Sequence, residues 1–346
     1  MSFVVINIVI NVPKRGVRFM LNVGDYVVRQ SYNKDILFRI TYISTNQMAK
    51  LKGVSYRVVA DAPVSDLVLA DGMRFTNQET DTMNKVQQTV EKIVKRRAEE
   101  AKNKGTSFMK TGTVLHVDGD SFYLNLCLKY YETLDVPVIG EHVPEIDQPK
   151  KIKYLLEKYS PDILVLTGHD ALNKNYKSLQ DMGEYRNSSY FIEAVKRARS
   201  VKPTMDSLVI FAGACQSYFE GILAAGADYA ASPGRVLIHA LDPVFIVEKI
   251  AHCPFHQVLP IEDALENTIT KFNGLGGYEI LGKCRRGGPV VEKKDNKQTI
   301  TSLDVDHMTD EEIDRELAKP LFKDSEEEFK SRMKTYMKCI NLDAKE

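Results

Sequence analysis

The 346-residue sequence lacks three features that would each have suggested a function. It has no net charge, because 47 Lys and Arg balance 47 Asp and Glu, and this balance disfavours a nucleic-acid-binding face. No apolar run approaches the length of a bilayer, so we expect no membrane span. The five cysteines are widely spaced and form no C-x-x-C motif, which indicates free thiols in a reducing compartment.

The pattern of the chain predicts five segments. Residues 1–19 are interpreted as an N-terminal extension, because a well-patterned segment starts at residue 20 and no signal-peptide pattern precedes it. Short apolar runs separated by turn residues predict a small SH3-like β-barrel over 20–76, a docking or stabilising module in its simplest interpretation. Helical spacing of apolar residues predicts a linker helix within 77–110. An α/β domain over 111–290 is followed by a loop and a charged helical tail over 291–346.

Residues 111–290 alternate between strand and helix patterns. This alternation predicts a three-layer α/β sandwich with a mostly parallel sheet. We expect strands at 114–117, 162–166 and 207–211, and an extended piece at 137–142. We expect helices at 122–131, 152–159, 190–200, 218–225 and 243–250.

A thiol and an imidazole follow two of these strands. His169 comes after the run that ends at Leu166, and Cys215 comes after the run that ends at Phe211. Functional groups collect at the carboxyl ends of parallel strands, where these two side chains would form a nucleophile and its base. Taken alone, Cys215 is equally compatible with a small core residue, and His169 with a histidine bonded to backbone. The two motifs together indicate a nucleophile and its base more specifically than either motif does alone.

A third strand end carries Asp118 and Asp120. Two carboxylates on the same rim would suit a basic side chain of a substrate, although an Asp-Gly-Asp turn explains the motif equally well. If the thiol and imidazole cleave peptide bonds, the motif predicts cleavage after Arg or Lys. Basic self-cleavage sites would then lie at 284–288, expected to be an exposed loop, or at 95–97, expected on the solvated face of the linker helix.

We expect no cofactor and no metal ion. His252, Cys253 and His256 are three potential zinc ligands, but no companion cluster supplies a further ligand. The glycine-rich stretch over 273–277 does not follow a predicted strand in the manner of a nucleotide-binding loop.

The two strand-end motifs carry a family resemblance. Thr167-Gly168-His169-Asp170, followed by Gly213-Ala214-Cys215-Gln216-Ser217, resembles the YabG family of sporulation-specific cysteine peptidases, and the likeness extends from Val23 to about Gly288. The wider arrangement is similar to the caspase, gingipain and legumain group, in which the catalytic His precedes the Cys by roughly 50 residues. The resemblance implies a caspase-like fold, with His169 as base and Cys215 as nucleophile.

The same resemblance implies a setting for the activity. It implies proteolysis of spore coat and cortex-associated proteins, including self-cleavage, in the mother-cell cytoplasm and at the spore coat of an endospore-forming bacterium. The sequence departs from the wider caspase-type pattern at Gly213, where Gln is usual, and at Asp170, where Gly is usual. We expect backbone around Gly168, Asp170 and Ala214, together with the Cys215 amide, to form the oxyanion hole.

Two alternatives stay open from the sequence. In a Cys-dependent amidotransferase or another α/β hydrolase, the nucleophile precedes its His, so His239 or His256 would replace His169. In a non-catalytic coat scaffold, Cys215 would be inert and the barrel and tail would bind partners.

Overall fold

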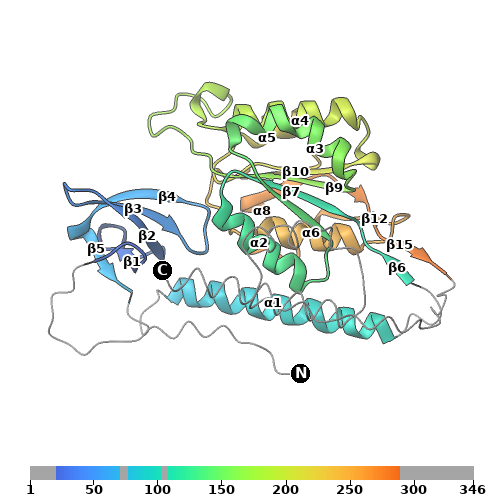
Figure 1. Ribbon diagram of the computed structural model, residues 1–346, viewed down its shortest axis with the longest axis horizontal. Coiled ribbons are helices and arrows are strands. Elements are labelled where there is room, and N and C mark those ends of the chain that lie inside the picture. Colours follow the sequence, from blue (N-terminus) through green and yellow to red (C-terminus); the bar gives the residue numbers. More distant parts are fainter. Residues whose placement is uncertain (1–20, 71–76, 103–107, 289–346) are drawn as a thin grey trace, which may run out of the picture. The chain divides into compact units, whose positions relative to one another are not determined.

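The computed structural model describes residues 21–70, 77–102 and 108–288 (Figure 1). The predicted N-terminal extension and the predicted loop and charged tail lie outside the described residues. The described part is mixed α/β and contains a five-stranded antiparallel sheet and a six-stranded, largely parallel sheet.

The first sheet, called here the N-terminal sheet, has the strand order β4-β3-β2-β1-β5. All its pairings are antiparallel, and alternate residues point into a small apolar core around Phe38, Ile40 and Leu51. Residues 54–58 form a loop after β3, and β4 begins at Val59. The strands are β1 (Tyr26–Arg29), β2 (Phe38–Ile43), β3 (Met48–Gly53), β4 (Val59–Pro63) and β5 (Leu67–Leu69).

The second sheet, called here the central sheet, has the order β13-β11-β10-β9-β7-β8. Strands β7 to β11 run parallel to their neighbours, and β13 pairs antiparallel at one edge. Continuous apolar runs form β9 and β10, as expected for strands buried on both faces. The strands are β7 (Val114–Asp118), β8 (Val138–His142), β9 (Ile163–Thr167), β10 (Val209–Ala212), β11 (Tyr229–Ala231) and β13 (Leu275–Gly277).

Helices cover both faces of the central sheet (Figure 1). One apolar core joins β9 and β10 to α3, α4 and α5, and a second core joins the opposite face to α2, α6 and α7. The predicted layering of helix, sheet and helix is thus present. The helices are α2 (Ser121–Thr133), α3 (Gln148–Tyr159), α4 (Ser188–Val201), α5 (Phe219–Ala224), α6 (Asp242–His252), α7 (Ile261–Leu265) and α8 (Lys271–Gly274).

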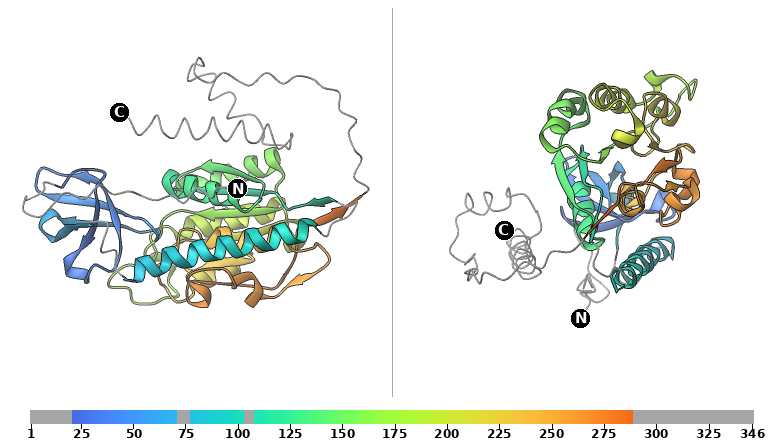
Figure 2. Two further views of the ribbon diagram at one scale, coloured as in Figure 1. Left: turned by 90° about the horizontal axis from the view of Figure 1, so that it is seen from below. Right: turned by 90° about the vertical axis from the view of Figure 1, so that its right-hand side faces the viewer.

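Helix α1 (Asn77–Lys102) lies alongside α6 (Figure 2). Val86 and Ile93 enter the core beneath the sheet. Arg96 and Arg97 both pair with Glu248 of α6, whose side chain is fully buried. The expectation that the 95–97 cluster is only a solvated face was therefore wrong for these two arginines, because a buried carboxylate on a distant helix cannot be seen in the local pattern.

The segment over 284–288 was also predicted incorrectly as a loop. Residues Arg285–Gly287 form β15, which pairs antiparallel with β6 (Phe108–Lys110) in a separate two-stranded sheet. A second small sheet joins β12 (Val258–Leu259) to β14 (Ile280–Leu281). The Gly and Arg residues of β15 are not typical of a strand. Its pairing also depends on a partner strand far away in the chain, so the local sequence did not indicate it.

Candidate active site

Three neighbouring strands deliver the candidate site residues to one rim of the central sheet. In the order β7-β9-β10, Asp118 pairs with Thr167, and Leu166 pairs with Ala212. Asp118 therefore ends β7, and His169 and Cys215 follow the ends of the adjacent strands β9 and β10. This placement is what the strand-end interpretation required.

Cys215 is a buried free thiol, 2% exposed. The amide of Ile238 lies 3.3 Å from its Sγ, and Gln216 donates to the carbonyl of Val236 at 3.2 Å. The segment 236–238 therefore covers the thiol. Burial raises the pKa of Cys215 to about 11, so the thiol stays protonated at neutral pH in this arrangement.

His169 is held in one orientation by a carboxylate. Its Nε2 lies 2.8 Å from Oδ2 of Asp120, and its side chain remains 25% exposed. Its amide donates to Oε1 of Glu145, and its carbonyl accepts from Asn187. The bond to Asp120 fixes the Nε2–H tautomer, which leaves Nδ1 as the nitrogen that can accept a proton.

Asp120 has a second partner from the N-terminal sheet. Lys52 of β3 places its Nζ 2.8 Å from Oδ2 of Asp120. Burial acts to raise the pKa of Asp120, but the hydrogen bonds from His169 and Lys52 outweigh it and hold the pKa well below its usual value. Asp120 also caps α2 by accepting from the amide of Phe122. The carboxylate is thus ionised, oriented and shared.

Asp170 connects the two candidate loops. Its carboxylate accepts from Ser188, from the amide of Asn187, and from Ser217 at 2.9 Å. The Ser217 hydroxyl in turn accepts from the amide of Ala214 at 2.9 Å. One buried carboxylate therefore joins the turn after His169 to the turn after Cys215, and the Ala214 amide already has a partner inside the protein.

The turns at both strand ends depend on backbone that larger residues would disturb. Gly213 has φ +109°, and Gln216 adopts the left-handed region at φ 59°, so the chain reverses tightly around Cys215. At Gly168 a Cβ atom would lie 2.3 Å from Oε1 of Glu145, the group that accepts from His169. The amide donors of an oxyanion hole at Asp170 and Cys215 stay a prediction.

Asp118 is fully buried and already binds a cation. Nη1 of Arg57, from the 54–58 loop, lies 2.6 Å from Oδ2 of Asp118, and both side chains are 0% exposed. Thr167 donates to the same oxygen at 2.8 Å. Burial acts to raise the pKa of Asp118, but the charge of Arg57 and the hydrogen bonds to His116 and Arg57 together outweigh it and hold the pKa well below its usual range. The two aspartates of the motif therefore have different surroundings, one facing a guanidinium and the other an imidazole.

His239 and His256 differ sharply from His169. His239 is buried, its Nδ1 accepts from the amide of Leu241 at 3.1 Å, and burial lowers its pKa to about 3. His256 is exposed and packs edge-to-face on Phe255. Within the residues that the structure describes, no group of three His, Cys, Asp or Glu side chains is arranged to hold a metal ion.

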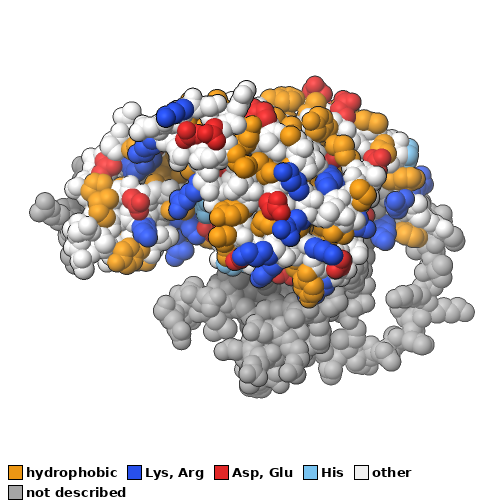
Figure 3. Space-filling view, turned by 90° about the horizontal axis from the view of Figure 1, so that it is seen from above, with side chains coloured by type: hydrophobic (Ala, Val, Ile, Leu, Met, Phe, Trp, Pro, Cys, Tyr) orange, Lys and Arg blue, Asp and Glu red, His pale blue; other side chains and the backbone are white. Residues whose placement is uncertain are grey.

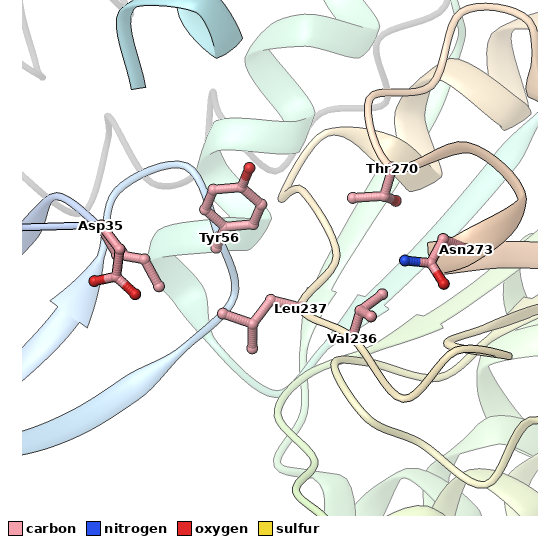
Figure 4. Close-up of a pocket in the computed structure, with 7 residues that line it drawn as sticks. Asp35, Tyr56, Val236, Leu237, Thr270 and Asn273 are labelled. Atoms are coloured by element: carbon pink, nitrogen blue, oxygen red, sulfur yellow. The ribbon is translucent and has the colours of Figure 1, made fainter. Parts of the chain in front are cut away.

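A pocket of about 390 Å³ opens beside the segment that covers the thiol (Figure 4). Asp35 and Tyr56 line it from the N-terminal sheet, and Leu237 and Asn273 line it from the α/β domain. Neither His169 nor Cys215 is part of its lining, so it adjoins the candidate site without containing it.

The outer surface gives no single-sign patch on the face drawn in Figure 3. Lys and Arg side chains are interspersed there with Asp, Glu and apolar side chains. None of the helices in the described part of the chain is long and apolar enough to cross a membrane.

A buried thiol and a carboxylate-held imidazole lie on neighbouring strand ends of an α/β sheet, an arrangement that many hydrolases use. The family model of the YabG peptidase U57 family matches residues 22–289, and the chain belongs to this family. Over 282 residues it is 43% identical to the sporulation-specific protease YabG of Bacillus subtilis (strain 168). The matched region covers 77% of this chain and 97% of that protein. The family prediction is confirmed, and the chain is a sporulation protease.

The sequence alone missed the contribution of the N-terminal sheet. Lys52 and Arg57 reach the site from a segment interpreted as a module without chemistry. Tyr123 of α2 connects the two parts, with its hydroxyl 2.7 Å from the carbonyl oxygen of Gly53 and its ring 5.7 Å from the His169 ring. An arginine within a run of strand-forming residues was the only signal, and it does not identify a partner.

Proposed function

We propose that the chain is a cysteine endopeptidase with Cys215 as nucleophile, His169 as general base and acid, and Asp120 as the group that orients His169. The observation that carries this proposal is the 2.8 Å contact between His169 Nε2 and Asp120, on the rim that also carries Cys215. Membership of a peptidase family supports the reaction class.

The reaction follows from the tautomer of His169. Nδ1 takes the proton of the Cys215 thiol, and the thiolate attacks the scissile carbonyl carbon. The C–N bond then breaks as Nδ1–H protonates the leaving amine, which leaves a thioester on Cys215. Water gives its proton to Nδ1 and attacks the thioester, releasing the new carboxyl end and restoring the thiol. The charge of Asp120 stabilises the imidazolium that forms at each proton transfer.

His169 is favoured over the other two histidines as the base. The imidazole of His239 is buried and carries its proton on Nε2, because Nδ1 accepts from Leu241. Its lowered pKa of about 3 makes proton uptake unfavourable near neutral pH. His256 precedes β12 in a separate small sheet. These positions weigh against the amidotransferase alternative.

We also propose a more specific fold for each of the two sheets. A parallel sheet with helices on both faces and the order His then Cys on successive strands supports a caspase-like sandwich for the central sheet and its helices. The five short antiparallel strands of the N-terminal sheet support an SH3-like barrel.

We take the substrates to be spore coat and cortex-associated proteins, cut after Arg or Lys, in the mother-cell cytoplasm and at the spore coat. The pairing of Asp118 with Arg57 supports a basic preference, because it shows a carboxylate on this rim holding a guanidinium. Asp120 is engaged with His169 and Lys52, so it serves the base rather than the substrate.

The 284–288 segment is the better of the two self-cleavage sites. Arg285 and Arg286 are exposed and extended in β15, the backbone form that proteases bind. Residues 95–97 lie inside helix α1, and Arg96 and Arg97 are paired with Glu248. Cleavage there requires the helix to unwind first.

Incubation with candidate coat proteins, followed by mapping of new termini, tests the proposal. Wild type should generate new ends after Arg or Lys, and Cys215→Ala and His169→Ala should generate none. His256→Ala is the matched control and should retain the wild-type pattern. Normal processing by Cys215→Ala would instead support the coat scaffold alternative, and loss of activity at His239 or His256 but not at His169 would support the amidotransferase-like one.

A further inference from the structure

The side chains around Asp118 have the composition of a subsite for an arginine side chain. Its floor is a buried carboxylate at the end of β7, which also accepts from Thr167 at 2.8 Å and from the amide of Asp120 at 2.9 Å. One wall is the ring of Tyr123, whose centroid lies 5.1 Å from the guanidinium carbon of Arg57. The other is Cys127, whose Sγ accepts from Nη2 of Arg57 at 3.3 Å.

The guanidinium beside Asp118 arrives on a loop that lies against the domain as a bound peptide would. The 54–58 loop connects β3 to β4, and its Ser55 carbonyl accepts from the amide of Ala240 at 2.8 Å. Tyr56 forms an antiparallel bridge with His239. Pairing of an extended segment with main chain, with one side chain in a pocket, is a common form of peptide recognition.

The segment 238–240, which pairs with the 54–58 loop, also contacts the candidate nucleophile. Ile238, directly before the bridged residue His239, has its amide 3.3 Å from Sγ of Cys215. An extended peptide in the place of residues 55–57 would therefore run beside Cys215 with its arginine on Asp118. The charge of Arg57 is close enough to act on the thiol, where it partly offsets the effect of burial.

The hydrogen bonding of Arg57 is incomplete for a purely structural ion pair. Its Nε is buried and has no hydrogen-bond partner among the described residues. Burying a guanidinium is unfavourable unless its donors are well satisfied, and apolar residues often join two structural units equally well. A subsite that must also accept and release a substrate side chain explains this incomplete hydrogen bonding better than a purely structural role does.

We propose that Asp118, Tyr123 and Cys127 form the subsite for a substrate arginine, and that Arg57 of the same chain occupies it here, so that the 54–58 loop competes with substrate. This inference rests on the proposed peptidase function. It assigns the ligand class, an extended peptide with an arginine side chain, and it makes the N-terminal sheet a part of the substrate-binding site.

Peptide binding in the Cys215→Ala background tests the subsite without requiring catalysis. The probe is a short peptide with a single arginine, compared with the same peptide carrying alanine. Adding Arg57→Ala should tighten binding of the arginine peptide at least tenfold and leave the alanine peptide unaffected. Arg39→Ala, which removes an exposed arginine from β2 of the same sheet, is the matched control and should not change the affinity.

The result also separates this inference from the peptidase proposal. Tighter arginine binding by a protein that never cleaves peptides would sustain the subsite and reject the peptidase. Cleavage by the Cys215 enzyme with equal affinity in both backgrounds would reject the subsite alone. In the wild-type fold, saturating arginine peptide should increase hydrogen exchange at residues 54–58, because the loop is displaced. Unchanged or slower exchange there overturns the proposal, whether or not Arg57→Ala folds.

Discussion

Nε2 of His169 and Oδ2 of Asp120 are 2.8 Å apart, although the two residues follow different strands of the central sheet. The contact joins the ends of β9 and β7 across the rim that carries Cys215. It leaves Nδ1 of His169 as the site of proton exchange, and each of the following predictions depends on that geometry or on the groups around it.

Asp120→Asn should lower kcat by about 100-fold with little change in KM, because a neutral amide neither fixes the Nε2–H tautomer nor stabilises the imidazolium. Asn keeps an oxygen for the α2 cap, so folding should be preserved. Steady-state kinetics on an arginine peptide, with circular dichroism as the folding check, measures this. Asp147→Asn, at an exposed carboxylate before α3, should leave kcat unchanged. A kcat within twofold of wild type in Asp120→Asn would remove the orienting role.

Alkylation of Cys215 by iodoacetamide should accelerate about tenfold per pH unit between pH 7 and pH 10, because the thiolate fraction rises below a pKa of about 11. Mass spectrometry of the Cys215 peptide separates this thiol from the other cysteines. Partly exposed Cys253 serves as an internal comparison and should react faster at each pH. A rate that levels off below pH 9 would contradict a buried, protonated thiol.

Lys52→Met should reduce stability by about 1 kcal/mol at pH 7, because it removes the lysine that pairs with the part-buried Asp120. The folded pKa of Asp120 lies below its ordinary value of 3.8, so this stabilisation is present above that pH and is lost as the pH falls further. Urea denaturation should therefore show a gap between variant and wild type that persists from pH 7 to pH 4 and narrows only in stronger acid, as the pH falls through the folded pKa of Asp120. Lys50→Met, at an exposed position on β3, is the control. A gap that widens in acid would have the wrong sign.

Asp170→Ala should destabilise the fold by about 2–3 kcal/mol, because Ser188 and Ser217 lose a buried acceptor and the Asn187 amide is left unpaired. Chemical denaturation gives the stability. Asp61→Ala, at an exposed position on β4, should fall within about 0.5 kcal/mol of wild type. Equal stability of the two variants would show that the carboxylate does not hold the two turns together.

The positions of His169 and Cys215 could be predicted because each follows a continuous apolar run that forms a buried parallel strand. Local sequence contains that information. The partners of these residues could not be predicted, because they come from distant segments. Arg57 and Asp118 are separated by 61 positions, and nothing in the run around Arg57 distinguishes it from an exposed strand residue. The same holds for Glu248, whose burial against α1 depends on how two helices pack.

The position of the Asp118-Gly119-Asp120 motif could be predicted from the sequence, but the roles of its two carboxylates could not. Both carboxylates lie at the predicted strand end. Their roles differ because contacts from outside the central sheet differ. Arg57 reaches Asp118, whereas Lys52 and His169 both bind Asp120. A pattern of alternating acidic residues cannot encode that division, because it is set by contacts from another sheet.

The pairing of β15 with β6 has a consequence for the lifetime of the enzyme. A cut after Arg286 falls at the end of the α/β domain, and the strands that carry Asp118, His169 and Cys215 all precede it. Such a cut would shorten the chain and leave intact the rim of the central sheet that carries these three residues. Processing at this point would therefore leave the enzyme active, and a chain that ends at Arg286 should retain full turnover.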